Sequence, residues 1–568
     1  MKHIFKITTL VLVCLLLQNS LFAREYMGAT KRATKSAKAE TGVERCRRAQ
    51  GSAELSINNV RARINTGGNM WYDGNTARYY VPKDGSSTAM FCAALWIGGQ
   101  DENKQLRVAA LRFGQDGDDF WPGPLTVDKN AAVNKSVCEK WDKHFRITKA
   151  EVEAFVAACP KNAQGQIIGG PTDPSLITEA IKTWPAHPEN YADLKQSKYL
   201  APFKDVDGDG EYNYSKGDYP YYDFNGDLCP VVAKQSGQRY NPIRTMEDSI
   251  GTGGEPVHGG ILVDQVLKGD ETLWWVFNDK GNAHTESKSQ NPIGLEIRAQ
   301  AFAFSMNDEI NNMTFYSYEI INRSTFTLQN TYFSQWVDPD LGYSHDDFVG
   351  CDVKRGLGYC YNGKATDGPG TGAYSGNPPA VGIDFFQGPY LDPDGLDNPK
   401  VYIDLVLGKE PEKLDKYLKK DANGQPIPGD YDTLLITANA EEFIDYWYNV
   451  NDKITNGANI NGVNFGNGII DDERFGMRRF VYYENSGHTT KGEPDKATDY
   501  YNYLRGMWKT GVKMTFGGDG TSGTVECDFM FPGNTDPWNW GTKGIIPTIT
   551  DTRGWTEESS NNSAGDRR

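Results

Sequence analysis

The densest group of chemically active side chains is the acidic stretch DVDGDGEYNYSKGDYP at residues 205–220. Asp205, Asp207 and Asp209 occur at alternate positions, and Gly210 follows, where an oxygen-rich loop must turn sharply onto a bound ion. Carboxylates this close repel one another unless a cation neutralises them, and calcium accepts the roughly six to eight oxygens that such a loop offers. The spacing therefore predicts a calcium-binding loop. The alternative is a solvated acidic turn without an ion.

The loop departs from the EF-hand pattern at Lys216, which stands where that motif has a bidentate Glu. The next carboxylate, Asp218, comes two residues later. We therefore expect a loop of another kind, closed by Asp218 or by a second half-loop directly after it. The ligands predicted for Ca²⁺ are Asp205, Asp207, Asp209, Glu211, Asp218, Asp223, Asn225 and Asp227.

Three further oxygen-rich clusters are weaker candidates for cation sites. They lie in LDPDGLDNP, in NFGNGIIDDE and around the corner QWVDPDLG. Extracellular calcium modules bind at about 10⁻⁴ to 10⁻³ M, so such loops fill outside a cell and not inside it. We expect the chain to stay loose until it is exported. The candidate residues are Asp392, Asp394, Asp397, Asn464, Asn467, Asp471, Asp472 and Glu473, and at the corner Asp338, Asp340, Asp346 and Asp347.

Residues 1–23 have the composition of a secretory signal peptide. Lys2 and Lys6 precede an apolar run at residues 10–17, and SLFA at residues 20–23 offers a cleavage site. Cys14 suggests a lipoprotein instead, but the residue before it is not small. No later segment reaches ~18 uninterrupted apolar residues. We expect export to the cell surface or the medium, with outer-membrane association as an option, and a mature chain without a transmembrane segment.

The composition excludes some classes of partner and predicts disulfides. A net charge of −16 and a pI near 5.1 argue against nucleic acid, which calls for a basic surface, and agree with cation binding. Removal of the signal with Cys14 leaves an even number of the nine cysteines, which in an exported chain predicts disulfides. Proximity suggests only the pair Cys351 and Cys360. The absence of CxxC pairs argues against a zinc site.

The hydrophobic pattern predicts a mainly β fold, with antiparallel β-sandwiches, small helical insertions and calcium-binding loops. Residues 90–97 are nearly all apolar, as in a strand buried on both faces. Residues 271–350 contain four strand-like segments, and in one of them alternation places Tyr316, Tyr318 and Ile320 on the core face. Thr148 and Glu151 form a capping box for a helix that ends near Cys159.

The predicted organisation follows these patterns along the chain, with helical patterns at residues 412–420 and 440–448 and renewed strands from residue 474. The segments are a signal peptide (1–23), a flexible basic arm (24–54), a β-rich region (55–125), a helical insertion (126–200), calcium-binding loops (201–235), a β-sandwich core (236–350), a loop and helical insertion (351–465), a β-rich return (466–549) and a polar tail (550–568).

Five motifs resemble a group of large exported β-rich proteins of the Bacteroidota that includes cargo of the type IX secretion system. They are LWIGG, DDFWPGP, DGDGEYN, QWVDPDLG and DDERFGMRRFVYY, at residues 95–99, 118–124, 207–213, 335–342 and 471–483. The resemblance covers residues 55–568 and implies an acidic, exported, β-rich protein, without implying catalytic residues. Such proteins commonly end in a sorting domain. Since no such domain follows Arg568 in this sequence, we expect the chain to be either incomplete or handled differently.

The residues favour a structural or adhesive role over catalysis. No His lies in HExxH or beside a GxSxG turn, although a pair of carboxylates for glycoside hydrolysis is not excluded in so acidic a chain. Trp538 and Trp540 are the best candidates for a sugar-stacking surface. We expect a calcium-stabilised surface protein whose partners are envelope proteins or surface glycans. The alternatives are a secreted glycan hydrolase and an accessory subunit of a secretion or gliding-motility assembly.

Overall fold

The computed structural model describes residues 45–115, 117–128, 130–186, 195–197, 200–222, 224, 266–390, 418–421, 423–431, 462–463, 474–536, 539–543 and 545–568. The predicted signal peptide and most of the predicted basic arm lie outside these residues. So do the predicted ligands Asp223, Asn225, Asp227, Asp392, Asp394, Asp397, Asn464, Asn467, Asp471, Asp472 and Glu473.

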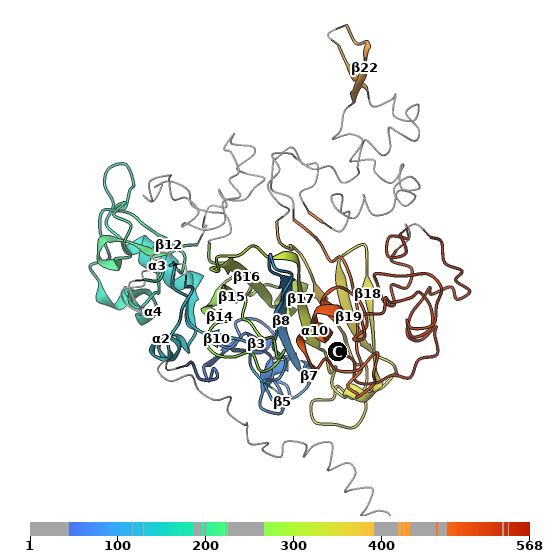
Figure 1. Cartoon of the computed structure of the whole chain (residues 1–568). Coiled ribbons are helices and arrows are strands. Elements are labelled where there is room, and N and C mark those ends of the chain that lie inside the picture. The colour runs from blue at the N-terminus through green and yellow to red at the C-terminus, as the bar shows by residue number, and fades with distance from the viewer. Residues whose placement is uncertain are drawn as a thin grey trace, which may run out of the picture. The chain divides into compact units, whose positions relative to one another are not determined.

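The large sheet is antiparallel and has the order β17-β8-β3-β2-β6-β7, with β1 paired to β2 and β9 to β8 (Figure 1). Its central strand β8 carries the apolar run expected to be buried on both faces, and only its last residue is partly exposed. A Cβ on Gly98 would lie 2.9 Å from Leu504, so the glycine lets α10 (Ala497–Leu504) approach the strand closely. The strands are β1 (Ser52–Leu55), β2 (Arg61–Asn65), β3 (Asn69–Met70), β6 (Tyr79–Tyr80), β7 (Thr88–Met90), β8 (Cys92–Gln100), β9 (Leu106–Ala109) and β17 (Gln329–Asp338).

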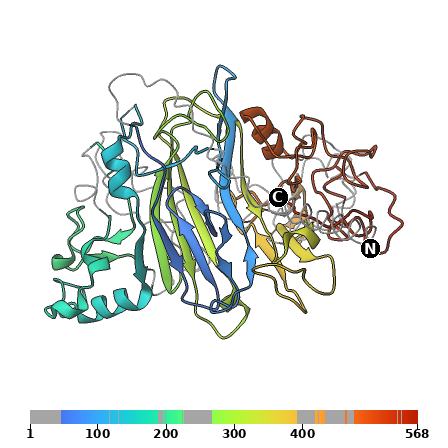
Figure 2. The same ribbon diagram turned by 90° about the horizontal axis from the view of Figure 1, so that it is seen from below.

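The middle sheet packs against the large sheet and contains β10 (Trp121–Pro122), β11 (Phe145–Thr148), β14 (Glu271–Asn278), β15 (Leu295–Ala303) and β16 (Phe315–Asn322). Every residue of β14 and β15 is buried. Because alternate side chains point to opposite faces, Trp275 joins the core shared with the large sheet and Trp274 joins a second core under the helices. Figure 2 shows these layers in succession: helical elements in cyan, the middle sheet in green and the large sheet in blue. The predicted mainly β, antiparallel fold is confirmed.

The helical layer covers the outer face of the middle sheet with α2 (Lys135–Trp141), α3 (Lys149–Ala158) and α4 (Glu179–Lys182). The predicted capping box is present: the Thr148 hydroxyl accepts from the Glu151 N–H, and the Glu151 carboxylate accepts from the Thr148 N–H. Val152 and Phe155 are buried beneath the helix, as expected. Two short 3₁₀ turns, η1 (Pro174–Leu176) and η3 (Tyr214–Lys216), complete this layer.

Of the predicted core face of β16, Tyr316 and Tyr318 pack against the main core, whereas Ile320 is 38% exposed near the end of the strand. The 3₁₀ turns η5 (Glu309–Asn312) and η6 (Ser344–Asp346) flank this region. Two small hairpins join β4 (Tyr72–Asp73) to β5 (Thr76–Ala77) and β21 (Leu418–Lys420) to β22 (Pro426–Tyr431). The helical pattern expected at residues 412–420 therefore ends in a strand where the chain is described.

The last layer differs from the prediction in two places. The region expected to be loop-rich after residue 350 forms a three-stranded sheet of β18 (Asp347–Asp352), β19 (Leu357–Asn362) and β20 (Ala380–Asp384). The strands expected from residue 474 are replaced, in the described part, by α10 and isolated bridges such as Phe480 with Phe529. Buried aromatic side chains, among them Tyr500 and Trp508, anchor this segment in the core, and its described part forms no continuous strand ladder. Among the described residues, every helix is too short or too polar to cross a bilayer.

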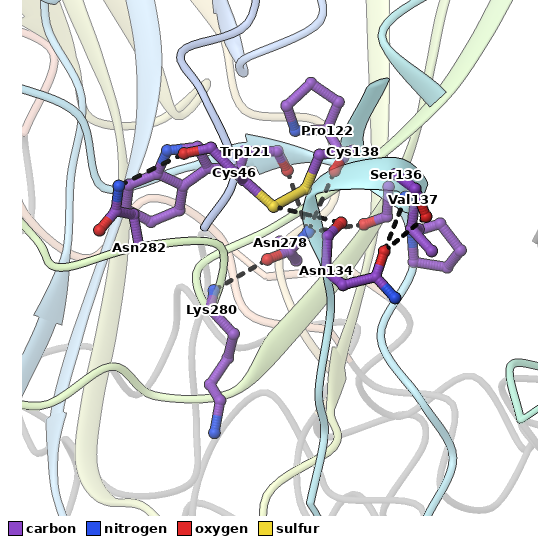
Figure 3. The surroundings of a disulfide bond; sticks show 12 residues. Cys46, Trp121, Pro122, Asn134, Ser136, Val137, Cys138, Asn278, Lys280 and Asn282 are labelled. Carbon is purple, nitrogen blue, oxygen red and sulfur yellow. Dashed lines mark hydrogen bonds between the residues drawn. A yellow bond between two sulfur atoms is a disulfide. The ribbon is translucent and has the colours of Figure 1, made fainter. Parts of the chain in front are cut away.

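The disulfide joins Cys46 to Cys138 and not Cys351 to Cys360 (Figure 3). It ties the start of the described chain to α2, with a Cα–Cα distance of 5.8 Å. In the β18–β19 register Cys351 lies opposite Gly358 and Cys360 opposite Val349, so the two cysteines are diagonal neighbours. Such a diagonal spans about 7–8 Å, too far for a disulfide. Both cysteines are buried thiols.

Candidate cation-binding site

The predicted calcium loop connects two short strands, β12 (Phe203–Lys204) and β13 (Tyr219–Pro220). They pair in antiparallel register, with Phe203 opposite Pro220. Asp205 directly follows β12 and Asp218 directly precedes β13, so the strand pairing fixes both ends of the loop. Phe203 and Tyr219 are buried in the core of the helical layer, which anchors this hairpin to the rest of the fold.

The loop brings Asp205, Asp207 and Asp209 together as predicted: one carboxylate oxygen of each lies within 4.8 Å of the others. Gly208 and Gly210 adopt φ angles of 76° and 78°, where glycine is favoured, and these turns fold the loop back on itself. The Asp205 carboxylate accepts the N–H groups of Gly208 at 2.7 Å and of Gly210 at 2.8 Å. The arrangement presents carboxylate oxygens to a common point, which is what a hard cation requires.

Asp218 holds the loop closed from inside and is not among these converging carboxylates. It is fully buried and accepts the N–H groups of Val206 at 2.8 Å and of Asn213 at 2.7 Å. Burial raises the pKa of Asp218 to about 6, although the two N–H groups act in the opposite direction. Glu211, also a predicted ligand, is exposed and lies outside the group of three.

Lys216 supplies an internal counter-charge to the loop. Its ammonium lies 3.0 Å from Asp207 Oδ2 and also contacts Asp209 Oδ2. Hydrogen bonds to Asp209 and Asp207 raise the pKa of Lys216, and the bond from Lys216 lowers the pKa of Asp209. The residue that breaks the EF-hand pattern therefore faces the same carboxylates that an ion needs. A bound cation must displace it.

A second group of carboxylates, one of them buried and two partly buried, lies at the end of β17. Oxygens of Asp338, Asp340 and Asp566 lie within 4.8 Å of one another. The sequence singled out Asp338 and Asp340 but missed Asp566, which comes from the C-terminal segment. That segment is fastened here by a bridge between Glu484 and Arg567. No local spacing marks Asp566 as a ligand, because only the tertiary fold brings it to the corner.

The other two acids predicted at this corner, Asp346 and Asp347, are buried beside this group. Asp347 Oδ2 accepts the N–H of Leu341 at 2.9 Å, and this bond closes the turn after β17. Burial raises the pKa of Asp347 to about 8, and burial together with Asp566 raises that of Asp340 to about 8. The corner thus concentrates acid groups in a place that disfavours negative charge.

A cavity of about 600 Å³ lies between β17, β19 and residues 475–483. Trp336, Tyr359 and Tyr483 line it together with Arg479 and Arg568. Aromatic walls with a few polar groups are typical of small-molecule sites. Arg568 lines the cavity and also pairs with Asp338, so this one side chain contacts both the cavity and the group of acids.

His284 is a buried cation of the core and is unsuited to act as a base. Its Nδ1 lies 2.8 Å from the Val108 carbonyl and its Nε2 2.7 Å from the Asp279 carbonyl. Carbonyl oxygens only accept, so both ring nitrogens must donate and the ring must be charged. Burial alone lowers the pKa of His284, but the carboxylates of Asp119 and Asp279, at 3.7 and 3.6 Å, and the two carbonyls raise it overall.

The chemistry common to the loop and the buried corner is a set of carboxylate oxygens without nitrogen or sulfur ligands. Such sets suit calcium or magnesium rather than zinc. Comparisons of the chain with protein-family models, with curated proteins and with solved structures give no match.

Proposed function

We propose that this chain is an exported, calcium-stabilised structural or adhesive protein of the cell surface or the medium. The observation that carries the proposal is the convergence of Asp205, Asp207 and Asp209 in a loop whose ends are fixed by β12 and β13. A cation binds there to the folded chain and not to the unfolded chain, so it stabilises the fold by mass action. The disulfide between Cys46 and Cys138 supports an oxidising compartment.

The size of the calcium effect follows from the affinity typical of extracellular modules. With a dissociation constant of about 10⁻⁴ to 10⁻³ M, about 10 mM Ca²⁺ is ten to a hundred times that constant. The expected stabilisation is then about 1.4–2.7 kcal/mol, and a chelator removes it. An unchanged melting temperature in calcium and in chelator refutes the calcium part of the proposal.

The matched variants are Asp207→Asn and Asp173→Asn in the full chain. The first removes one converging carboxylate, and the calcium-dependent rise in melting temperature is expected to shrink. The second changes an exposed Asp of the same layer that caps a 3₁₀ turn, where Asn is an equally good cap. Its calcium response is expected to equal that of the wild type. Equal responses of both variants exclude the loop as the site.

An exposed apolar segment supports a role in contacting other molecules. Ile545, Ile546 and Ile549 are 53%, 81% and 44% exposed, so this short segment presents three apolar side chains to solvent. A pull-down from the native envelope with the wild type and with an Ile546→Ser variant is expected to retain partners only with the wild type. A glycan array that also scores product release separates adhesion from the alternative of a hydrolase: release of product from any glycan favours the hydrolase.

A further inference from the structure

The corner after β17 is built from two parts of the chain that are far apart in sequence. Asp338 is the last residue of β17 and lies opposite Cys92 of β8 in the large sheet. Asp566 lies in the C-terminal segment, where Asn485 Nδ2 donates to Asp566 Oδ2 at 2.7 Å. The carboxylates of Asp338, Asp340 and Asp566 meet at this junction. Whatever neutralises them therefore links the large sheet to the C-terminal segment.

The environment of Asp338 is a second observation, independent of the clustering of the carboxylates. It is fully buried, and neither of its carboxylate oxygens accepts a hydrogen bond. The same holds for Oδ1 of Asp340 and Oδ1 of Asp566, which are also shielded from water. The only cation that faces Asp338 among the described residues is Arg568, and a buried carboxylate that accepts no hydrogen bond is poorly compensated for its lost hydration. These oxygens point to a ligand that supplies positive charge.

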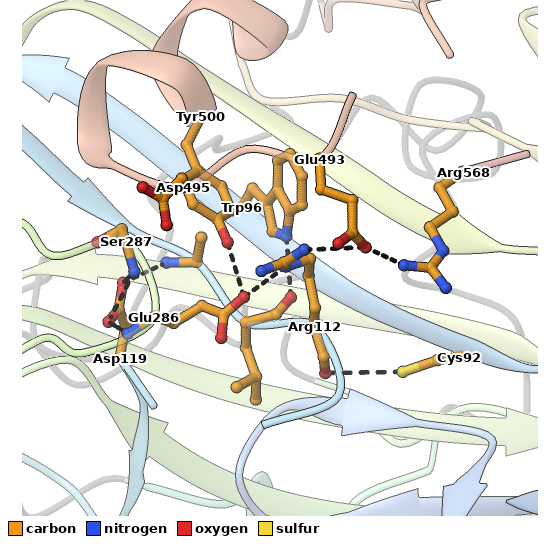
Figure 4. A network of polar contacts seen from close by, with 12 residues as sticks. Cys92, Trp96, Arg112, Asp119, Glu286, Ser287, Glu493, Asp495, Tyr500 and Arg568 are labelled. Carbon is orange, nitrogen blue, oxygen red and sulfur yellow. Dashed lines mark hydrogen bonds and ion pairs between the residues drawn. The ribbon is translucent and has the colours of Figure 1, made fainter. Parts of the chain in front are cut away.

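The arginines at the junction do not balance this charge; Figure 4 shows their contacts with Glu493 and Glu286. Arg568 Nε lies 3.3 Å from Asp338 Oδ2 and 3.5 Å from Asp566 Oδ1, and the same guanidinium contacts Glu493. Arg112, next in the network, is 3.3 Å from Glu493 and is also bound to Glu286. Each guanidinium is thus shared among several carboxylates, while Asp340 adds a further one.

We propose that Asp338, Asp340 and Asp566 form a partly buried site for one divalent cation, Ca²⁺, which fastens the C-terminal segment to the corner after β17. The donors are all oxygens, as a hard cation prefers. Calcium tolerates irregular oxygen geometry, whereas magnesium demands a near-ideal octahedron and keeps its waters, which a fully buried Asp338 disfavours. This site is separate from the exposed loop and does not depend on it.

The test is the number of calcium ions bound by the full chain, measured by equilibrium dialysis at saturating Ca²⁺. Asp566→Asn is the first variant because this residue is partly exposed and more tolerant of change than Asp338. It is expected to bind one calcium fewer per chain than the wild type. Asp551→Asn changes a partly exposed residue of the same segment that pairs with Arg553; it is the matched control and is expected to bind as many as the wild type.

Two outcomes overturn the proposal. One is an unchanged calcium number in Asp566→Asn. The other is an Asp566→Asn protein that melts higher than the wild type in chelator and in calcium alike, because crowded carboxylates without an ion gain stability when one charge is removed. The loop variant Asp207→Asn separates the two sites. If the number of bound calcium ions falls in Asp566→Asn but not in Asp207→Asn, the corner site is supported and the loop site is refuted. If it falls in Asp207→Asn but not in Asp566→Asn, only the corner site is refuted.

Discussion

Replacing Arg112 with Met is expected to destabilise the fold more than any single change on the exposed surface. Arg112 follows β9, and its Nε donates to Glu286 Oε1 at 2.5 Å, which also accepts the Tyr500 hydroxyl from α10 at 2.7 Å (Figure 4). Arg112 is 4% exposed and Glu286 2% exposed. The pair therefore joins the large sheet, the loop after β14 and the C-terminal layer in the interior.

The magnitude follows from what the substitution leaves behind. Burial raises the pKa of Glu286, and Arg112 opposes that rise, so without the guanidinium the carboxylate is a buried charge with one hydroxyl donor. Breaking one side of a buried pair costs about 3–5 kcal/mol. The control is Lys288→Met, because Lys288 lies two residues after Glu286 and pairs at 2.6 Å with Asp495, just before α10, with side chains 55% and 74% exposed. An exposed pair contributes about 0–1 kcal/mol.

The assay is urea unfolding followed by tryptophan fluorescence, since urea does not screen charges as guanidinium chloride does. A double-mutant cycle combines Arg112→Met with Glu286→Leu. The double variant is expected to lose less stability than the two single variants together, because no unpaired charge remains. The interpretation is refuted if Arg112→Met unfolds at the same urea concentration as Lys288→Met. It is also refuted if the stability losses of Arg112→Met and Glu286→Leu add in the double variant, because the two side chains then do not interact.

Three further predictions concern the core, the disulfide and the loop. His284 has a raised pKa in the folded protein, so its contribution to stability is complete below about pH 6.5, its ordinary value, and is lost as pH rises through the raised pKa; unfolding curves from pH 5 to 9 check this, and a contribution that grows with pH refutes it. Replacing Cys46 and Cys138 with Ala opens a loop with a sequence separation of 92 residues, and a loss of about 4–5 kcal/mol is expected from chain entropy; a melting temperature equal to that of the wild type contradicts this. Lys216→Met removes a cation that contacts two loop carboxylates and is expected to tighten calcium binding several-fold, because the ion no longer competes with the ammonium for Asp207 and Asp209; calorimetry against Lys204→Met as control measures the affinity, and equal affinities refute the prediction.

The features that could be predicted from sequence are those set by residues close together in the chain. Alternation and continuous apolar runs identified the strands now seen as β8, β14 and β15, because burial on one or both faces leaves a direct trace in the local pattern. The capping box at Thr148 is likewise a contact across three residues. The convergence of Asp205, Asp207 and Asp209 was recognisable for the same reason.

The features that could not be predicted depend on pairings between distant segments. Cys46 and Cys138 carry no mark of their partnership, whereas the nearness of Cys351 and Cys360 misled, since a hairpin register decides which residues face each other. The segment after residue 474 has strand-like composition but pairs with no neighbouring strand in the described part of the chain, so its apolar residues are buried by irregular packing and by α10. Local preference for a strand does not provide its partner.

The two acidic groups differ in their exposure to water and in the cation beside them, which is Lys216 at the loop and Arg568 at the corner. In the exposed loop, a flexible ammonium already neutralises two of the carboxylates, and water screens the rest. An ion there exchanges with Lys216 at little cost, so occupancy is expected to follow the calcium concentration. At the corner, Asp338 is shielded from solvent and accepts no hydrogen bond, and the guanidinium that faces it is shared with Glu493. Losing an ion from such a place exposes charge to a low dielectric, so calcium bound at the corner should leave only when the C-terminal segment detaches.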